Sequence, residues 1–255
     1  MNTQALSKPF PSLGASSAAP ALAPASDAPP DRLLFALRMA AWASAICVAL
    51  MLALSWLTGL NVQHFEVVAS PAAWSAELLA HASALRGITV IDDAFIACYL
   101  TVSLLLVHAL RTRAAPGDLP HVLGPWVMGL GGLTGLLDIV ENHHVLSLLH
   151  AASVGLPLSA DALVSREVLS SAKWMLGHVA FVLVGVAIGF RSLPWRAFRW
   201  VLVCVQLPVG AAALALAGTP MGEWLGWCKL LNVMGGFLLL AVLPWPRASG
   251  SGAPA

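Results

Sequence analysis

Six long apolar segments are the feature that most limits what this chain can fold into. Crossing about 30 Å of hydrocarbon takes roughly 20 helical residues at 1.5 Å each, and every one of these segments is long enough to do so. They are residues 34–60, 88–110, 122–148, 167–190, 199–218 and 224–244. The sequence therefore predicts an all-α polytopic membrane protein with six transmembrane helices.

The composition excludes three other classes of protein. Only 10% of the 255 residues are charged, whereas a soluble domain carries about 25%, so a soluble globular enzyme is excluded. The net charge is +1 and the sequence contains no basic stripe, which excludes a nucleic-acid partner. Four cysteines are too few for a disulfide scaffold in a chain of this length. The expected partner is the lipid bilayer, with a small solute or lipid as an unidentified ligand.

The two ends of the chain differ in composition from its centre. Residues 1–31 are rich in Pro, Ala and Ser and lack apolar periodicity, which predicts a disordered cytoplasmic tail. Residues 247–255 predict a second disordered tail, with a six-helix domain over 32–246 between them. Because the first apolar run starts only after Arg32, we expect no cleaved signal peptide.

The placement of Lys and Arg predicts the orientation in the membrane, since cytoplasmic loops carry an excess of both. With the N-terminus inside, only Arg86 and Arg166 fall in outside loops, so both termini are expected in the cytoplasm. High usage of Ala, Leu and Arg with few Lys is typical of a GC-rich bacterium, and we therefore expect a bacterial inner membrane. The cytoplasmic positions are Lys8, Arg32, Arg111, Arg113, Arg191, Arg196, Arg199 and Arg247.

Tryptophans and the longest loop give two further expectations. Nine of the ten Trp residues, Trp174 among them, fall near the proposed span ends, as in an aromatic belt. The tenth, Trp74, lies in the outside loop 61–87, where Trp74, Leu78 and Leu85 recur at helical spacing. This loop forms either a short interfacial helix or a merely ordered connection.

Acidic residues enter the membrane in the third span. Its uncharged run, residues 122–137, is sixteen residues long, or about 24 Å, which is too short to cross. The helix must therefore continue through Asp138, Glu141 and Asn142, and this places two carboxylates in the outer half of the bilayer. Charges there are costly unless they are paired or wet, so both carboxylates need partners.

Polar residues on other spans lie at a matching depth. Asp92 and Asp93 begin the second span, Lys173 the fourth and Lys229 the sixth, all within about 7–13 Å of the outer boundary. Helical phase groups them on faces that can point to one centre, and the pair Gly131 and Gly135 allows close helix approach. The faces are Gly131, Thr134, Gly135, Asp138 and Glu141; Asp92, Tyr99 and Ser103; Ser170, Lys173 and Gly177; and Lys229, Asn232 and Gly236.

Two simpler interpretations remain open for these charges. Asp92 and Asp93 can cap the start of the second helix, where the helix dipole favours acids. Alternatively, the whole cluster can be a buried ion-pair network that fixes helix register without doing chemistry.

Histidines raise the possibility of a metal ion, although the sequence otherwise predicts no cofactor. Glu141 and His144 have the Glu-x-x-His spacing that places a carboxylate and an imidazole on one helix face, and His178 lies midway along the fourth span. Asp92, Glu141, His144 and His178 are the hypothetical ligands. A second Glu-x-x-His is absent from the sequence, as are nucleophile motifs and nucleotide-binding fingerprints.

Three functions fit these residues. In a proton-coupled small-solute carrier, Asp138 or Glu141 binds the proton and Lys173 is the internal counter-charge. In a membrane-embedded enzyme acting on a lipid or lipid-linked substrate, Glu141 or Asp138 is the general base, assisted by His144 or His178. The third function is structural or partner-binding. The residues expected to contact a substrate are Asp92, Tyr99, Asn142, Lys229 and Asn232.

Overall fold

The computed structural model describes residues 30–60, 65, 70–190 and 192–245, and this part of the chain consists of helices and their connections without a strand. The predicted tails fall outside it, except for the last two residues of 1–31, which begin the first helix. In order, the elements are α1 (Pro30–Thr58), α2 (Pro71–Ala80), α3 (Ala82–Arg111), α4 (Leu119–Ser153), α5 (Ala160–Ala187), α6 (Leu193–Trp200), the π-helical segment η2 (Val201–Gln206), α7 (Leu207–Ala215) and α8 (Pro220–Val242).

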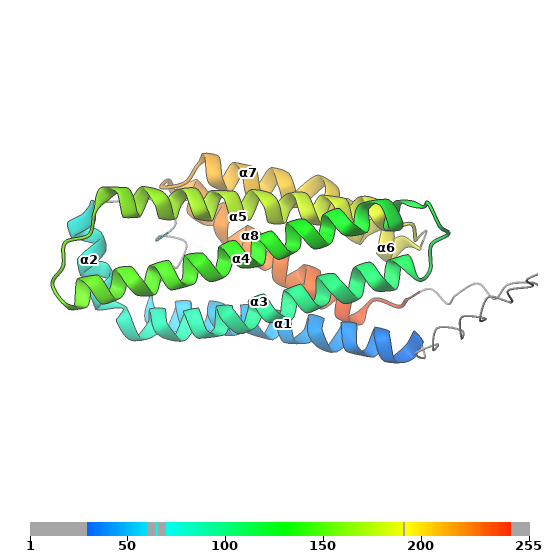
Figure 1. Ribbon diagram of the computed structural model, residues 1–255, viewed down its shortest axis with the longest axis horizontal. Helices are drawn as coiled ribbons and strands as arrows, with labels where there is room; N and C mark the ends of the chain where they lie inside the picture. Colours follow the sequence, from blue (N-terminus) through cyan, green and yellow to red (C-terminus); the bar gives the residue numbers. More distant parts are fainter. Residues whose placement is uncertain (1–29, 61–64, 66–69, 191, 246–255) are drawn as a thin grey trace, which may run out of the picture.

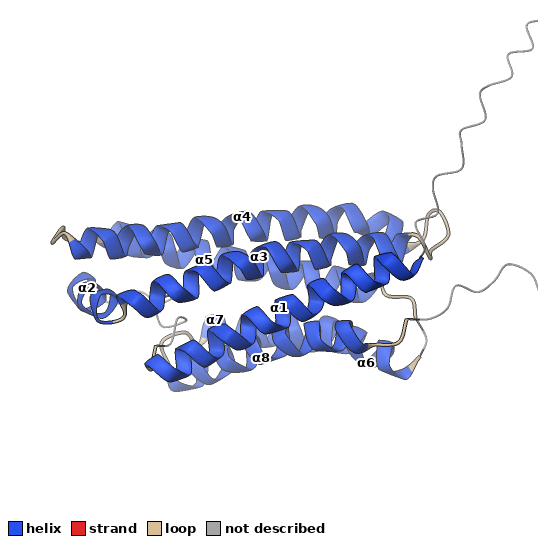
Figure 2. Cartoon of the chain, turned by 90° about the horizontal axis from the view of Figure 1, so that it is seen from below, coloured by secondary structure: helices blue, strands red, loops and turns tan. Residues whose placement is uncertain are grey.

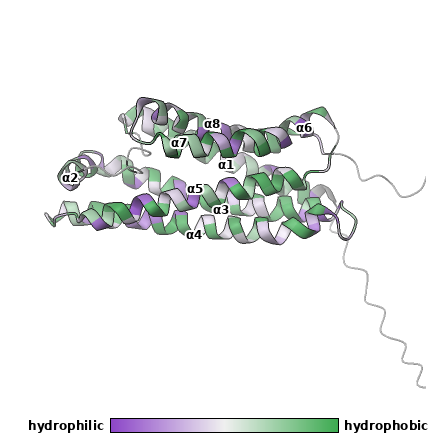
Figure 3. Ribbon diagram, turned by 90° about the horizontal axis from the view of Figure 1, so that it is seen from above, coloured by the Kyte–Doolittle hydropathy of each residue, from purple (hydrophilic) through white to green (hydrophobic). Residues whose placement is uncertain are grey.

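Six spans long and apolar enough to cross a membrane are found, with α6, η2 and α7 together forming the fifth. This confirms the predicted all-α, six-span architecture. The outer surface carries large exposed apolar side chains such as Phe35, Trp56 and Val90, and hydrophobic residues run along the length of the helices (Figure 3). An apolar exterior of this kind is the surface that lipid tails cover, so the protein is a multi-pass membrane protein in contact with the bilayer.

The spans close into a ring. Each contacts its neighbour in the order α1, α3, α4, α5, η2 with α7, and α8, and α8 packs back against α1. Successive spans run in opposite directions, and the described chain starts and finishes at the same end, opposite α2 (Figures 1 and 2). We call these the α2 end and the α6 end of the bundle.

The helix predicted in the loop 61–87 is confirmed as α2. Ser70 caps it by accepting a hydrogen bond from the Ala73 amide at 3.3 Å, and Pro71 occupies the first turn, where its missing N–H costs nothing. Trp74 and Leu78 are buried against the bundle, and the Phe65 ring meets Trp74 edge-on at 5.0 Å. The alternative of a merely ordered loop is therefore wrong.

The helices at the α2 end are longer than the apolar runs that predicted them. α3 begins at Ala82, α5 begins at Ala160 and α4 continues to Ser153, because a helix that satisfies its own backbone does not stop where polar residues begin. Asp92 and Asp93 consequently lie about 15 Å from the start of α3, and the prediction that they cap it is wrong.

The same lengthening moves Arg166 out of its predicted outside loop and into α5, where it is buried. Arg86 is then the one exposed Arg at the α2 end among the described residues. The arginines toward the α6 end are Arg32, Arg38, Arg111, Arg113, Arg196 and Arg199. The described residues thus retain the charge bias toward the α6 end, and the cytoplasmic location of the termini stays a prediction.

The fifth span changes its helical pitch in the middle. Between α6 and α7 the six residues of η2 form a π-helix, and Pro208 is the second residue after it. Proline lacks the N–H that would bond to the carbonyl of residue 204, and a wider turn accommodates this loss. π-helical turns are frequent at functional sites, and this one directs Gln206 toward the centre of the ring.

Candidate functional site

Two acids on α4 meet two bases on α5 inside the ring. Lys173 Nζ lies 2.9 Å from Asp138 and also contacts Glu141, whose other oxygen lies 3.1 Å from Arg166. Lys173 thus bridges two carboxylates one helical turn apart, and Glu141 bridges two cations. The predicted meeting of Asp138, Glu141 and Lys173 is confirmed, and these residues lie about 18–22 Å from the helix ends at the α2 end.

Arg166 is the site residue that the sequence interpretation assigned wrongly. It is nearly inaccessible, its Nε donates a hydrogen bond to the Phe65 carbonyl at 2.8 Å, and its guanidinium lies over the Trp74 ring at 5.9 Å. A signal was present, since Arg166 is seven residues before Lys173 and therefore on the same helix face. The predicted apolar span begins at residue 167, so Arg166 was assigned to the preceding loop.

α3 is joined to the acidic face of α4 by two side chains. The Tyr99 hydroxyl donates to Asp138 at 2.7 Å, and the Asn142 amide donates to Asp92 and to Asp93 at 2.9 Å each. Gly135 makes the approach possible, because a Cβ there would lie 2.9 Å from Leu100 and 3.2 Å from the Tyr99 oxygen. The predicted close helix packing is thus confirmed at Gly135, whereas a Cβ at Gly131 would lie in ordinary contact, 3.9 Å from Ser103 Oγ.

The α8 residues reach the centre from the opposite wall. The Lys229 ammonium lies 3.5 Å from the Trp174 ring centroid, a cation–π contact. Asn232 donates a hydrogen bond to Gln206 of η2. Trp174, predicted as a belt residue, instead lies midway along α5 on the inner wall.

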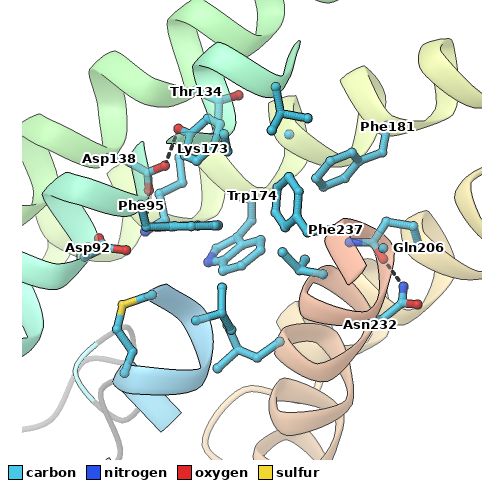
Figure 4. Close-up of a pocket in the computed structure, with 18 of the residues that line it drawn as sticks. Asp92, Phe95, Thr134, Asp138, Lys173, Trp174, Phe181, Gln206, Asn232 and Phe237 are labelled. Atoms are coloured by element: carbon cyan, nitrogen blue, oxygen red, sulfur yellow. Dashed lines mark hydrogen bonds and ion pairs between the residues drawn. The ribbon is translucent and has the colours of Figure 1, made fainter. Parts of the chain in front are cut away.

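A cavity of about 380 Å³ occupies the centre of the ring, within the range of pockets that bind small molecules. The acid–base cluster lines one side, the Gln206–Asn232 pair lines the other, and aromatic side chains lie between them (Figure 4). The labelled aromatic residues are Phe95, Trp174, Phe181 and Phe237.

The two histidines proposed as metal ligands occupy different surroundings. His178 is 1% exposed, stacks on Trp174 at 5.7 Å and packs against Gly210, while the Nδ1 atom of His144 is buried. Within the described ranges, no group of three or more His, Cys, Asp or Glu side chains is arranged to hold a metal ion. A metal bound by His144 and His178 stays a prediction.

Gly210 of α7 provides a test of how tightly α7 packs against His178 of α5. A Cβ at Gly210 would overlap His178 Nε2, so Gly210→Ala should lower the free energy of unfolding by about 1–3 kcal/mol, as overpacking does. Adding His178→Ala should restore stability by removing the clashing ring. Gly132→Ala is the matched control, since no atom lies within 4 Å of its Cβ position. Equal loss in both glycine variants, measured by denaturant titration in mixed micelles, would contradict this packing.

Comparison with known proteins identifies no relative: no family model, curated protein or solved structure matches the chain. The geometry alone therefore carries the functional argument. It provides a closed helix ring, a mostly apolar cavity and a lysine shared between two carboxylates in the cavity wall.

Proposed function

We propose that this protein is a proton-coupled small-solute carrier of a bacterial inner membrane. The observation that carries the proposal is the position of Lys173 between Asp138 and Glu141 in the wall of a central cavity. A lysine with two alternative anionic partners can change its partner when one of them takes up a proton. Ionisable residues inside membrane spans are associated with such proton relays.

The coupling follows from charge. Protonation of Asp138 removes the charge that attracts Lys173, leaves Tyr99 hydrogen-bonded to a neutral carboxyl and lets the ammonium turn fully to Glu141. The electrostatic field on the cavity side of Asp138 changes with this shift. A solute that binds one of the two arrangements more tightly must, by reciprocity, also change the affinity for the proton.

Burial divides the cluster into two parts with different roles. The Glu141 and Arg166 side chains are each 3% exposed, whereas Lys173 and Asp138 are 11% and 14% exposed. The accessible pair is the one that can exchange protons and sense a solute. The inaccessible pair is Glu141 and Arg166, and Arg166 is also hydrogen-bonded to the Phe65 carbonyl. For these two residues we propose the architectural role, in which an ion pair fixes helix register.

The experiment is proton flux in reconstituted vesicles. Purified protein is placed in liposomes that contain a pH-sensitive dye, a pH gradient is imposed, and neutral, cationic and anionic small solutes are added in turn. In liposomes that contain the protein, we expect at least one class of solute to make the internal pH change faster than it does in protein-free liposomes with the same solute. If every class gives the protein-free rate, the carrier proposal is wrong.

A further inference from the structure

The cavity wall carries one more acid than base. The charged side chains that line it are Asp92, Asp138, Glu141, Arg166 and Lys173, three acids and two bases. Lys229 is not among the lining residues, and its ammonium lies against the Trp174 ring. The ion pairs account for Asp138 and Glu141. Asp92 accepts a hydrogen bond from the neutral amide of Asn142, and no Lys or Arg of the described part of the chain lies within ion-pair distance of it. The cavity therefore presents a carboxylate that makes no direct ion pair with a described residue of its own wall.

The opposite side of the cavity presents a hydrogen-bond donor. Gln206 is 3% exposed, its oxygen accepts the hydrogen bond from Asn232, and its Nε2 is buried without a hydrogen-bond partner. Figure 4 shows this nitrogen on the side of Phe237, away from Asn232. A buried donor without an acceptor loses the hydrogen bond that it would make with water, so this position favours a ligand that brings an acceptor.

Aromatic side chains connect the two sides. Phe95 follows Asp92 by one helical turn on α3, and its ring packs edge-on against Phe237 of α8 at 5.7 Å. Phe181 and Trp174 complete the wall between the acid and the amide (Figure 4). Aromatic faces favour organic cations and apolar rings over hydrated inorganic ions.

We propose that the cavity binds an apolar organic amine whose ammonium group pairs with Asp92 and whose far end offers a hydrogen-bond acceptor to Gln206. This inference rests on the proposed function in that it names the solute class of the carrier. It requires no covalent step, because the ligand enters and leaves unchanged.

Four isosteric probes test the proposal by equilibrium binding to the purified full-length protein. They are 4-methoxyphenethylamine; 1-methoxy-4-propylbenzene, which replaces the ammonium with a methyl group; 3-(4-methoxyphenyl)propanoate, which reverses the charge; and 4-ethylphenethylamine, which replaces the ether oxygen with a methylene. We expect the methoxy amine to bind more tightly than the first two analogues by roughly tenfold or more, and more tightly than the ethyl amine by about fivefold, the values for charged and neutral hydrogen bonds.

Two variants assign these preferences to their residues. Asp92→Asn should abolish the preference for the amine over its neutral isostere and keep that for methoxy over ethyl, while Gln206→Leu should do the reverse. Asp93→Asn is the matched control, because Asp93 shares the Asn142 amide but does not line the cavity. Since each readout is a ratio of two ligands on one variant, a partial loss of folded protein does not change it.

The outcomes separate this inference from the carrier proposal. If none of the probes binds, or if the neutral or anionic analogue binds as well as the amine, the inference is wrong, even where another solute drives proton flux. If the protein binds the amine selectively but no solute gives proton flux, the amine site is supported and the carrier proposal is wrong.

The ammonium group can also come from an ethanolamine lipid headgroup. Repeating the titration in phosphatidylglycerol nanodiscs with and without phosphatidylethanolamine distinguishes the two sources. Competition by the lipid identifies it as the occupant, and unchanged affinity identifies a free amine. Either result supports the ammonium site.

Discussion

Replacing Glu141 with glutamine should lower the free energy of unfolding by about 3–5 kcal/mol, the loss typical of a buried ion pair that keeps only one partner. Glu141 contacts both Arg166 and Lys173. In the variant, Lys173 retains Asp138, whereas the buried Arg166 faces a neutral amide in place of the Glu141 carboxylate. The Arg166 Nε still donates to the Phe65 carbonyl, but this neutral acceptor does not replace the charge of the Glu141 carboxylate.

The pair Glu141→Gln and Arg166→Met forms a double-mutant cycle for this prediction. The double variant should recover most of the stability, because it buries neither charge, with an interaction energy near the upper end of the roughly 0.5–3 kcal/mol found for contacting residues. Unfolding by denaturant titration in mixed micelles is the measurement. Arg86→Met and Glu223→Gln, both exposed, are the controls. Additive losses in the double variant would show that the pair does not act as a unit.

The double variant Asp138→Asn/Lys173→Met should fold like the wild type and lose proton coupling. It removes one acid and one base together, so the net charge of the cavity wall does not change, and the amide oxygen at position 138 can still accept from Tyr99. The ratio of solute uptake with and without a pH gradient should fall by roughly 5–150-fold, the usual range of coupling between two bound ligands.

The measurement is uptake of the solute that gives proton flux in the wild-type vesicles, together with a denaturation curve for each variant. Asp93→Asn is the control, since Asp93 contacts Asn142 and takes no part in the Lys173 bridge. If the folded double variant retains proton coupling, the coupled proton binds to a residue other than Asp138, and the prediction is wrong. Loss of folded protein in the double variant would contradict the expectation that Lys173 and Asp138 are dispensable for architecture.

The position of the acids could be predicted from sequence because hydrocarbon sets a minimum helix length. Sixteen uncharged residues before Asp138 could not cross the membrane, so the helix had to carry Asp138 and Glu141 inward. Their need for counter-charges then pointed to Lys173. These inferences rest on helix rise and desolvation, which are properties of any chain.

The rest of the site depends on packing that one sequence does not encode in its periodicity. Arg166 follows a polar stretch and was counted as a surface charge, although the helix extends to Ala160. The position of Gln206 does not follow from α-helical phase, because it is the last residue of the π-helical segment η2, whose turns are wider. Trp174 was grouped with belt residues because proximity to a span boundary does not distinguish a ring facing lipid from one facing a cavity.

The order in which the charged helices occur along the chain has a consequence for membrane insertion. The ion-paired residues lie on α4 and α5, two consecutive helices joined by a short connection. Asp138 and Glu141 can therefore pair with Lys173 and Arg166 as soon as α5 has been synthesised, before the fifth and sixth spans are made. The pairing of these four charges therefore does not wait for the fifth and sixth spans, and α8 closes the ring around ion pairs that already exist.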